Sequence, residues 1–381
     1  MMSFFQHCYY LLRATVWLAL AFARAGWYFR FRALRDLALP RAEALTSKEK
    51  RRLQHYFYGT TYLSAVFCLL RGYPRNAREK HLFTNLAALA YFFDDLVDSF
   101  RGRDDSGILW LDNPELFGQT ADPRGLALHF LDNIHRELPP SELPQFKEFM
   151  HRVFNVETAG RQARADTHLQ VEDLKNITAE KGGYSVLLFR QVLEHPLFAP
   201  EQEALYQFGY LVQLSDDIFD LWHDRKSGTV TLATFLAEQN DVTRLRDIFE
   251  EQVAVVRAAF LEIPNLPEVP GNMARPTTSK SRKMKWVIPP ALPQRRQSAL
   301  RTRSARTATR RLPSPPDLTR ELGASAAVHF LVSITRVCLR HYEDLQKKHG
   351  TLPLDARSLM VVDMEKWGNR VRAAKALAMA K

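Results

Sequence analysis

Apolar residues recur along most of this chain at intervals of three and four, the spacing that places them on one face of an α-helix. No run alternates between apolar and polar residues in the way that a half-buried strand would. The pattern therefore predicts an all-α protein. Its helices are long enough to form a single-domain bundle around a central cavity.

Start and stop signals bound several of these helices. Thr46 and Glu49 have the spacing of a capping box, and the helix that they begin is expected to end at Gly72. Further helices are expected over residues 76–102, 123–138, 141–160, 180–193, 318–350 and 358–377, with a polar loop over residues 102–118. Gly182 and Gly183 predict either a break in their helix or a close contact with another helix.

Composition divides the chain into three kinds of sequence. Residues 1–40 are apolar and aromatic and are expected to be an N-terminal amphipathic helical region. Residues 41–263 and 317–381 are expected to form one helical domain. Residues 264–316 interrupt that domain with proline-rich, arginine-rich sequence, which has too little apolar surface to offset chain entropy. We therefore expect a disordered basic insert, with no role or with a binding role.

The net charge of +11 is concentrated in this insert. Residues 271–311 hold twelve of the 53 Lys and Arg residues and no acidic residue, so the remaining 41 basic residues balance 42 acidic ones. Such a segment attracts phosphates. An alternative function is therefore a non-catalytic helical protein that binds nucleic acid or an anionic membrane. Trp286 is the only aromatic residue there, so base stacking is not indicated and nucleic acid is not the favoured partner.

The cysteines and the N-terminus bear on location. Cys8, Cys68 and Cys338 are widely separated and support neither a disulfide framework nor a zinc site, which favours a cytoplasmic setting. The longest uncharged run after Arg13, residues 14–23, is half of what a membrane-spanning helix needs. Three alternatives remain for this region: a helix that is buried or at the bundle edge, an interfacial amphipathic helix in peripheral contact with a membrane, and a cleaved signal.

Two groups of aspartates stand out, each directly after an apolar run. The first group is Asp94, Asp95 and Asp98, and the second is Asp216, Asp217, Asp220 and Asp224. Residues three and four apart share a helix face, so each group predicts a stripe of negative charge that needs a positive partner. Mg²⁺ ions held between two such stripes would neutralise a diphosphate leaving group.

A prenyl diphosphate that loses its diphosphate becomes an allylic carbocation, which must be kept from water. Aromatic rings can stabilise such a cation by about 0.5 to 2 kcal/mol each. The candidate cavity residues are Phe92, Phe93, Tyr184 and Phe219. Ordinary core packing is the alternative for these rings.

The motifs DDLVD at residues 94–98 and DDIFD at residues 216–220 together resemble those of the class I isoprenoid synthase superfamily, over roughly residues 45–236. The resemblance implies an all-α fold and Mg²⁺-dependent ionisation of a prenyl diphosphate. The catalytic aspartates that it implies are Asp94, Asp95, Asp98, Asp216, Asp217 and Asp220. The metal ligands that it implies are Asp94, Asp98, Asp216, Asp220 and Asp224.

The resemblance leaves the branch of the superfamily open. QLSDDIFDLWHDRKSG is similar to the second motif of chain-elongating trans-prenyltransferases, whereas Asp220, Asp224, Gly228 and Leu232 match the pattern of squalene and phytoene synthases. The Asn, Ser and Glu ligand triad of many terpene cyclases is missing. A transferase or lyase acting on prenyl diphosphates is therefore expected, and a homodimer stays open.

The resemblance also implies basic residues that bind the diphosphate. The candidates are Lys181, Arg225, Lys226, Arg71, Arg75, Arg101 and Arg103. Lys181 matches the place of a diphosphate-binding lysine in the elongating enzymes, and Arg101 and Arg103 resemble the basic pair after their first motif. The alternative for each is an ordinary surface charge.

Overall fold

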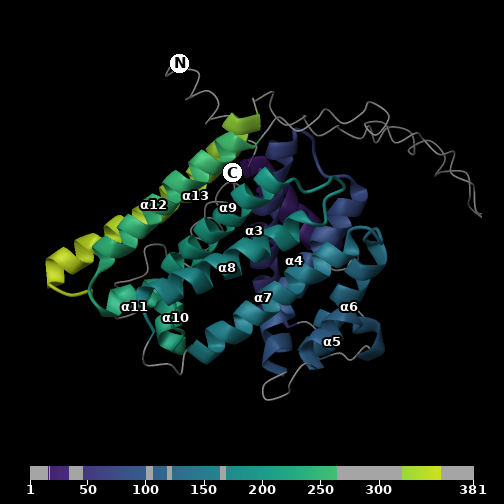
Figure 1. The fold of residues 1–381 in the computed structure, drawn as a ribbon, viewed down its shortest axis with the longest axis horizontal. Coiled ribbons are helices and arrows are strands. Elements are labelled where there is room, and N and C mark those ends of the chain that lie inside the picture. Colours follow the sequence, from purple (N-terminus) through teal and green to yellow (C-terminus); the bar gives the residue numbers. More distant parts are fainter. Residues whose placement is uncertain are drawn as a thin grey trace, which may run out of the picture. The chain divides into compact units, whose positions relative to one another are not determined.

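The computed structural model describes residues 16, 18–33, 46–99, 106–117, 122–163, 169–263 and 320–352. Every secondary-structure element in these ranges is a helix, so the prediction of an all-α fold is confirmed for them (Figure 1). The chain divides into one compact unit of Met1–Pro264 with Pro315–Lys381 and a second of Asn265–Ser314. The basic insert and the expected last helix lie outside the described residues.

Long helices make up most of the fold. They are α3 (Ser47–Arg71), α4 (Ala77–Ser99), α7 (Leu143–Ala163), α8 (Val171–Arg190), α9 (Ala199–Phe219), α12 (Val242–Glu262) and α13 (Arg320–His349). The shorter elements are η1 (Phe29–Ala33), which precedes α3, and α5 (Ser106–Asp112), η2 (Pro114–Phe117), α6 (Pro123–Glu137), α10 (Leu221–Ser227) and α11 (Leu232–Glu238), which lie between the long helices.

Helix α3 begins and ends where its capping residues predict. The Thr46 hydroxyl accepts a hydrogen bond from the Glu49 backbone N–H at 3.2 Å, and the Glu49 carboxylate accepts one from the Thr46 N–H at 2.6 Å. At the other end Gly72 has a φ of 80°, in the left-handed region that glycine adopts without steric cost. Its N–H donates to the carbonyl oxygen of Cys68 at 3.0 Å. Local sequence thus sets both ends.

Helices α8 and α9 lie side by side and touch through glycines (Figure 1). A Cβ atom on Gly182 would lie 2.1 Å from the Gly209 carbonyl oxygen, and one on Gly209 would lie 2.2 Å from the Gly182 carbonyl oxygen. Helix α8 runs through Gly182 and Gly183 without a break. Of the two alternatives for these glycines, the close helix contact is therefore confirmed.

The segment over residues 102–118 differs from the expected polar loop, because it contains α5 and η2. Leu111 is 1% exposed and belongs to the hydrophobic core. The Lys147 ammonium of α7 donates a hydrogen bond to the Asp112 carbonyl oxygen at 2.6 Å, next to the C-terminal end of α5. Burial of Leu111 and the contact with Lys147 stabilise α5, a short helix that the polar composition did not predict.

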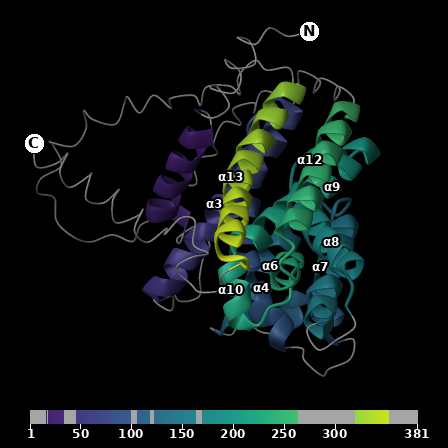
Figure 2. The same ribbon diagram turned by 90° about the vertical axis from the view of Figure 1, so that its left-hand side faces the viewer.

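Helices α12 and α13 lie side by side although residues 263–319 separate them in sequence (Figures 1 and 2). Arg336 of α13 makes an ion pair with Glu250 of α12 at 2.6 Å. The Tyr342 hydroxyl of α13 donates to the Ile218 carbonyl oxygen of α9 at 2.9 Å. Sequence after the insert therefore packs at the C-terminal end of α9, beside the second aspartate group.

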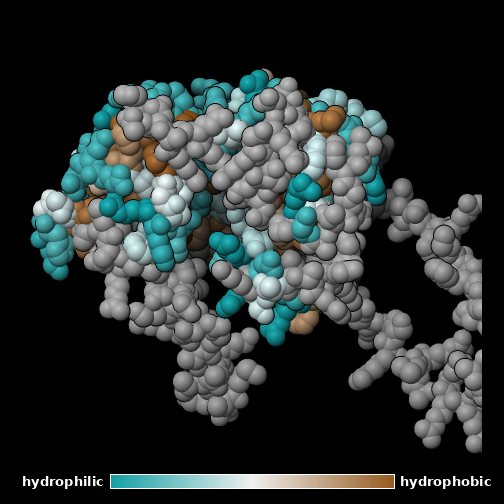
Figure 3. All heavy atoms as spheres, turned by 90° about the horizontal axis from the view of Figure 1, so that it is seen from below, coloured by the Kyte–Doolittle hydropathy of each residue, from teal (hydrophilic) through white to brown (hydrophobic). Residues whose placement is uncertain are grey.

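The N-terminal region is helical where it is described, over residues 18–33, and it packs on α3. The ring centroids of Phe22 and Tyr58 are 6.0 Å apart, and those of Phe29 and Phe57 are 5.5 Å apart. Within the described ranges, no helix has the length and apolar character needed to cross a membrane. On the face seen in Figure 3, polar side chains (teal) surround apolar ones (brown).

Candidate functional site

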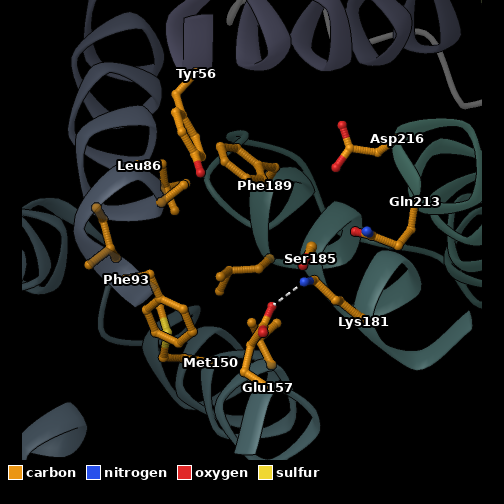
Figure 4. Close-up of a pocket in the computed structure, with 14 residues that line it drawn as sticks. Tyr56, Leu86, Phe93, Met150, Glu157, Lys181, Ser185, Phe189, Gln213 and Asp216 are labelled. Atoms are coloured by element: carbon orange, nitrogen blue, oxygen red, sulfur yellow. Dashed lines mark ion pairs between the residues drawn. The ribbon is translucent and has the colours of Figure 1, made fainter. Parts of the chain in front are cut away.

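A pocket of about 200 Å³ is formed by residues of α3, α4, α7, α8 and α9 (Figure 4). Its apolar lining consists of Leu86, Leu89, Ala90, Phe93, Met150, Val153, Leu188 and Phe189. Its polar lining consists of Tyr56, Glu157, Lys181, Ser185, Gln213 and Asp216. Such a cavity suits a ligand that has an apolar chain and a charged end.

Both helices that carry the aspartate groups line this pocket. Helix α4 contributes a wall that ends at Phe93, the residue before Asp94, and α9 contributes Gln213 and Asp216. The structure thus brings together two segments that are more than 100 positions apart in the sequence. The side chains of Asp94, Asp95 and Asp98 lie outside the described residues, so a direct facing of the two groups stays a prediction.

The adjacent residues Asp216 and Asp217 have different surroundings. The Asp217 side chain accepts a hydrogen bond from Gln213 Nε2 at 2.8 Å and a longer one from the Thr178 hydroxyl at 3.4 Å, and the residue is 5% exposed. Asp216 is exposed and directs its carboxylate into the pocket (Figure 4). Asp217 is therefore held as a buried structural group, and its predicted catalytic role has no support in this placement.

The C-terminal end of α9 has an excess of negative charge. Burial against the surrounding protein, followed by the like charge of Asp220 and Asp224, raises the pKa of Asp216 to about 6, although Lys181 opposes this effect. Asp216 is still accessible because one side of its carboxylate faces the pocket. Burial also raises the pKa of Asp220. Raised carboxylate pKa values mean that the nearby residues do not balance this charge, so a cation would be stabilised here.

Asp216 and Asp220 fit the requirements of Mg²⁺. They are four residues apart, one helical turn, and in the described part of the chain neither carboxylate accepts a side-chain hydrogen bond or ion pair. No three His, Cys, Asp or Glu side chains in the described ranges come together as a metal site. Mg²⁺ does not need such a cage, because one or two carboxylates commonly hold it together with waters and substrate phosphate oxygens.

The predicted continuous stripe along one helix is wrong at Asp220. Helix α9 ends at Phe219, and Asp220, with φ −93° and ψ 7°, separates it from α10. Asp224 therefore belongs to a different helix from Asp216. Asp220 lies at the junction of α9 and α10. It belongs to both motif patterns that the sequence left open, the one that contains Asp216 and the one that contains Asp224.

Lys181 is the predicted basic residue that the described structure places in the pocket lining. Its Nζ atom lies 2.9 Å from the Glu157 Oε1 atom of α7 (Figure 4). Arg225 lies in α10 with a guanidinium nitrogen 3.5 Å from a Glu238 carboxylate oxygen, and Lys226 beside it is exposed. The pocket lining includes neither of these two residues. Arg101 and Arg103 lie outside the described residues.

Arg71 and Arg75 do not line this pocket, so their binding of diphosphate stays a prediction without support from this site. Arg71 is 2% exposed and makes a two-pronged ion pair with Glu79, with one nitrogen–oxygen distance of 2.6 Å. The Arg75 guanidinium lies over the Phe83 ring, 5.1 Å from its centroid. Glu79 is near the start of α4 and Asp94 is 15 residues further on, about 22 Å along the helix axis.

Of the four predicted cavity aromatics, Phe93 lines the pocket. Phe92 is 2% exposed and stacks on Phe130 in the core, with centroids 6.0 Å apart. Tyr184 packs against Tyr206, and the exposed Phe219 is not part of the lining. A side chain's neighbour in sequence shares its helix but not its face, which is why a run of aromatics divides between pocket and core.

Sequence reasoning missed most of the polar lining. The missed residues are Tyr56, Glu157, Ser185 and Gln213. They come from α3, α7, α8 and α9, and no spacing within one helix identifies them. The one local signal was Gly182, because the close approach that it permits brings Gln213 of α9 against α8.

The described site combines an apolar chamber with the Lys181 ammonium and the Asp216 carboxylate in its lining, and Asp220 follows directly after α9. It can bind an anion and a divalent cation together, beside an apolar chain. Comparison of the chain with protein-family models, with curated proteins and with solved structures gives no match.

Proposed function

We propose that this protein is a Mg²⁺-dependent isoprenoid synthase that ionises a prenyl diphosphate to an allylic carbocation and then condenses or cyclises it. The observation that carries the proposal is the pocket, in which Lys181 and Asp216 lie at the polar part of an otherwise apolar wall. A prenyl diphosphate has the same division, with an apolar chain and a highly charged end. The aspartate motifs at residues 94–98 and 216–220 add independent support.

The charged end of the substrate binds at the polar part of the lining. The Lys181 ammonium contacts diphosphate oxygens, and its ion pair with Glu157 keeps it directed into the pocket. Asp216 and Asp220 hold Mg²⁺, together with Asp94 and Asp98 of α4. When bound, Mg²⁺ neutralises the charge that develops on the departing diphosphate.

The apolar lining receives the prenyl chain. The electron pair of the carbon–oxygen bond leaves with the diphosphate, and the π electrons of a second isoprenoid or of the same chain then attack the cation, with loss of a proton. Aliphatic side chains such as Leu86 and Met150 keep water away from the cation. Phe93, Phe189 and Tyr56 provide rings along the same chamber.

The test is release of inorganic diphosphate from geranyl, farnesyl and geranylgeranyl diphosphate, with and without Mg²⁺. We expect Mg²⁺-dependent release from at least one of them and loss of release with EDTA. Mass spectrometry of the products then separates condensation from cyclisation. If none of the three is consumed while the protein retards DNA or RNA at physiological salt, the basic segment over residues 271–311 is the functional part and the enzyme proposal is wrong.

A further inference from the structure

The N-terminal helix is apolar on two opposite faces. Its inner face packs on α3 and contains Leu18, Phe22, Ala25 and Phe29. Its outer face contains Val16, Leu20, Trp27 and Phe31, whose exposed fractions are 50%, 42%, 60% and 53%. We call these four residues the N-terminal stripe. The outer face of a surface helix normally carries polar residues, so packing on α3 does not explain the stripe.

The stripe is continuous along the helix. At 3.6 residues per turn, Val16, Leu20 and Trp27 fall within about 40° of one another around the helix axis. The Trp27 and Phe31 ring centroids are 5.4 Å apart, which places Phe31 on the same side. The helix is drawn in purple in Figure 2. Four large apolar side chains therefore form one surface.

Positive charge accompanies the stripe. Arg24 and Arg30 are exposed, and the Arg30 guanidinium lies 5.6 Å from the Phe31 ring centroid. Residues 1–35 contain five arginines and no acidic residue. An apolar helix face with Trp and Phe, flanked by arginines, has the chemistry that binds at the boundary between anionic headgroups and acyl chains.

We propose that the N-terminal stripe docks on an anionic membrane surface. Trp27 and Phe31 enter the headgroup region, and Arg24 and Arg30 contact lipid phosphates. Charge complementarity favours lipid over a second copy of the chain, because two copies paired through this face would bring their arginines together. This inference does not depend on the proposed catalytic activity.

The test is co-sedimentation of the full chain with vesicles of phosphatidylcholine alone and of phosphatidylcholine with phosphatidylserine. We expect binding to the anionic vesicles and at least tenfold weaker binding by the double variant Trp27→Gln with Phe31→Gln. Leu261→Gln is the matched control, because Leu261 of α12 is 70% exposed but lies outside the stripe. It should bind like the wild type. The Arg24→Gln with Arg30→Gln variant should have a weaker preference for anionic vesicles than the wild type.

High salt distinguishes vesicle binding through residues 271–311 from binding through the N-terminal stripe. Salt screens a purely electrostatic attraction but does not weaken apolar insertion. At high salt, binding that remains in the wild type and is lost in the double variant supports the proposal. Brominated lipids should quench less fluorescence in Trp27→Phe than in the wild type, at equal binding. Equal vesicle affinity of double variant and wild type overturns the proposal. The proposal is also overturned if the wild type does not bind vesicles and instead forms a dimer that is absent in the double variant.

Discussion

The Lys181 ammonium lies 2.9 Å from the Glu157 carboxylate, so α7 and α8 place an ion pair in the lining of the pocket. Glu157 is the more buried partner, with a side chain 15% exposed against 37% for Lys181. The pair holds a positive charge near Asp216, whose pKa Lys181 lowers against the effects of burial and like charge. A negative ligand that enters the pocket must share Lys181 with Glu157.

Replacing Glu157 by Gln should strengthen binding of inorganic diphosphate. The change removes one negative charge from the pocket and keeps an oxygen that accepts a hydrogen bond from Lys181. We expect a Kd about three- to tenfold lower, which corresponds to about 0.7 to 1.4 kcal/mol. Isothermal titration calorimetry without Mg²⁺ measures it.

Lys181→Gln should act in the opposite direction and weaken diphosphate binding by at least about tenfold. Lys175→Gln on the same helix is the control, since Lys175 pairs with the exposed Glu172 outside the pocket. It should change nothing. If Glu157→Gln and Lys181→Gln bind diphosphate with equal affinity, neither residue belongs to the anion site.

Asp216→Asn and Asp217→Asn should have very different effects on diphosphate release. Asp216 faces the pocket, and losing its charge should reduce release by about 100-fold or more, as the loss of one electrostatic contact to a transition state does. Asn at position 217 can still accept the hydrogen bond from Gln213, so that variant should stay within a few-fold of the wild type. Steady-state kinetics with a saturating metal concentration compares them. Similar losses in both variants would contradict the assignment of Asp217 as structural.

Gly182→Ala should destabilise the protein by about 3 kcal/mol, because the new methyl group would lie 2.1 Å from the Gly209 carbonyl oxygen and force α8 and α9 apart. Gly59→Ala in α3 is the matched control. Apart from the nearby backbone of α3 itself, no atom lies within 4 Å of a Cβ atom there, so alanine should stabilise the helix by about 0.5 to 1 kcal/mol. Urea unfolding measures both changes. If Gly182→Ala has the same urea midpoint as the wild type, α8 and α9 can move apart to fit the methyl group without loss of stability.

His135 should make the fold sensitive to mild acid. Burial, with the positive charge of Lys147 as a smaller cause, lowers the pKa of His135 from 6.5 to about 4. Between these values the unfolded chain binds a proton that the folded protein does not, so stability falls as the pH decreases from about 6.5 to about 4. NMR titration of the His135 ring should give the lowered pKa.

The His135→Leu variant should lose less stability over this pH range than the wild type does. The Phe146 ring packs edge-on against His135, with centroids 6.0 Å apart, so an apolar side chain is compatible with the site. The wild type and the variant have the same carboxylates. The contribution of these groups to the pH dependence therefore cancels when the change in unfolding free energy across the range is compared between the two proteins. Parallel pH profiles would show that His135 titrates normally in the folded state.

Several parts of the structure follow from short stretches of sequence. Thr46, Glu49 and Gly72 determine the ends of α3 because caps are satisfied by atoms within a few residues. The glycines of α8 indicated a close contact, and the structure identified Gly209 as the partner. The sequence also singled out the aspartate-rich segment after residue 214, since charge is a local property, but the structure divides that segment between the end of α9 and α10.

The tertiary structure decided which of these residues meet. It placed Asp216 in the pocket and Asp217 in a hydrogen bond with Gln213, and it paired Arg71 with Glu79 far from the aspartates. It also brought Glu157 beside Lys181, a contact between residues of separate helices. By itself the sequence determined an all-α chain with two acidic segments, because helix formation and charge depend on neighbours along the chain. The pocket depends on how helices pack, and that is a property of contacts between distant segments.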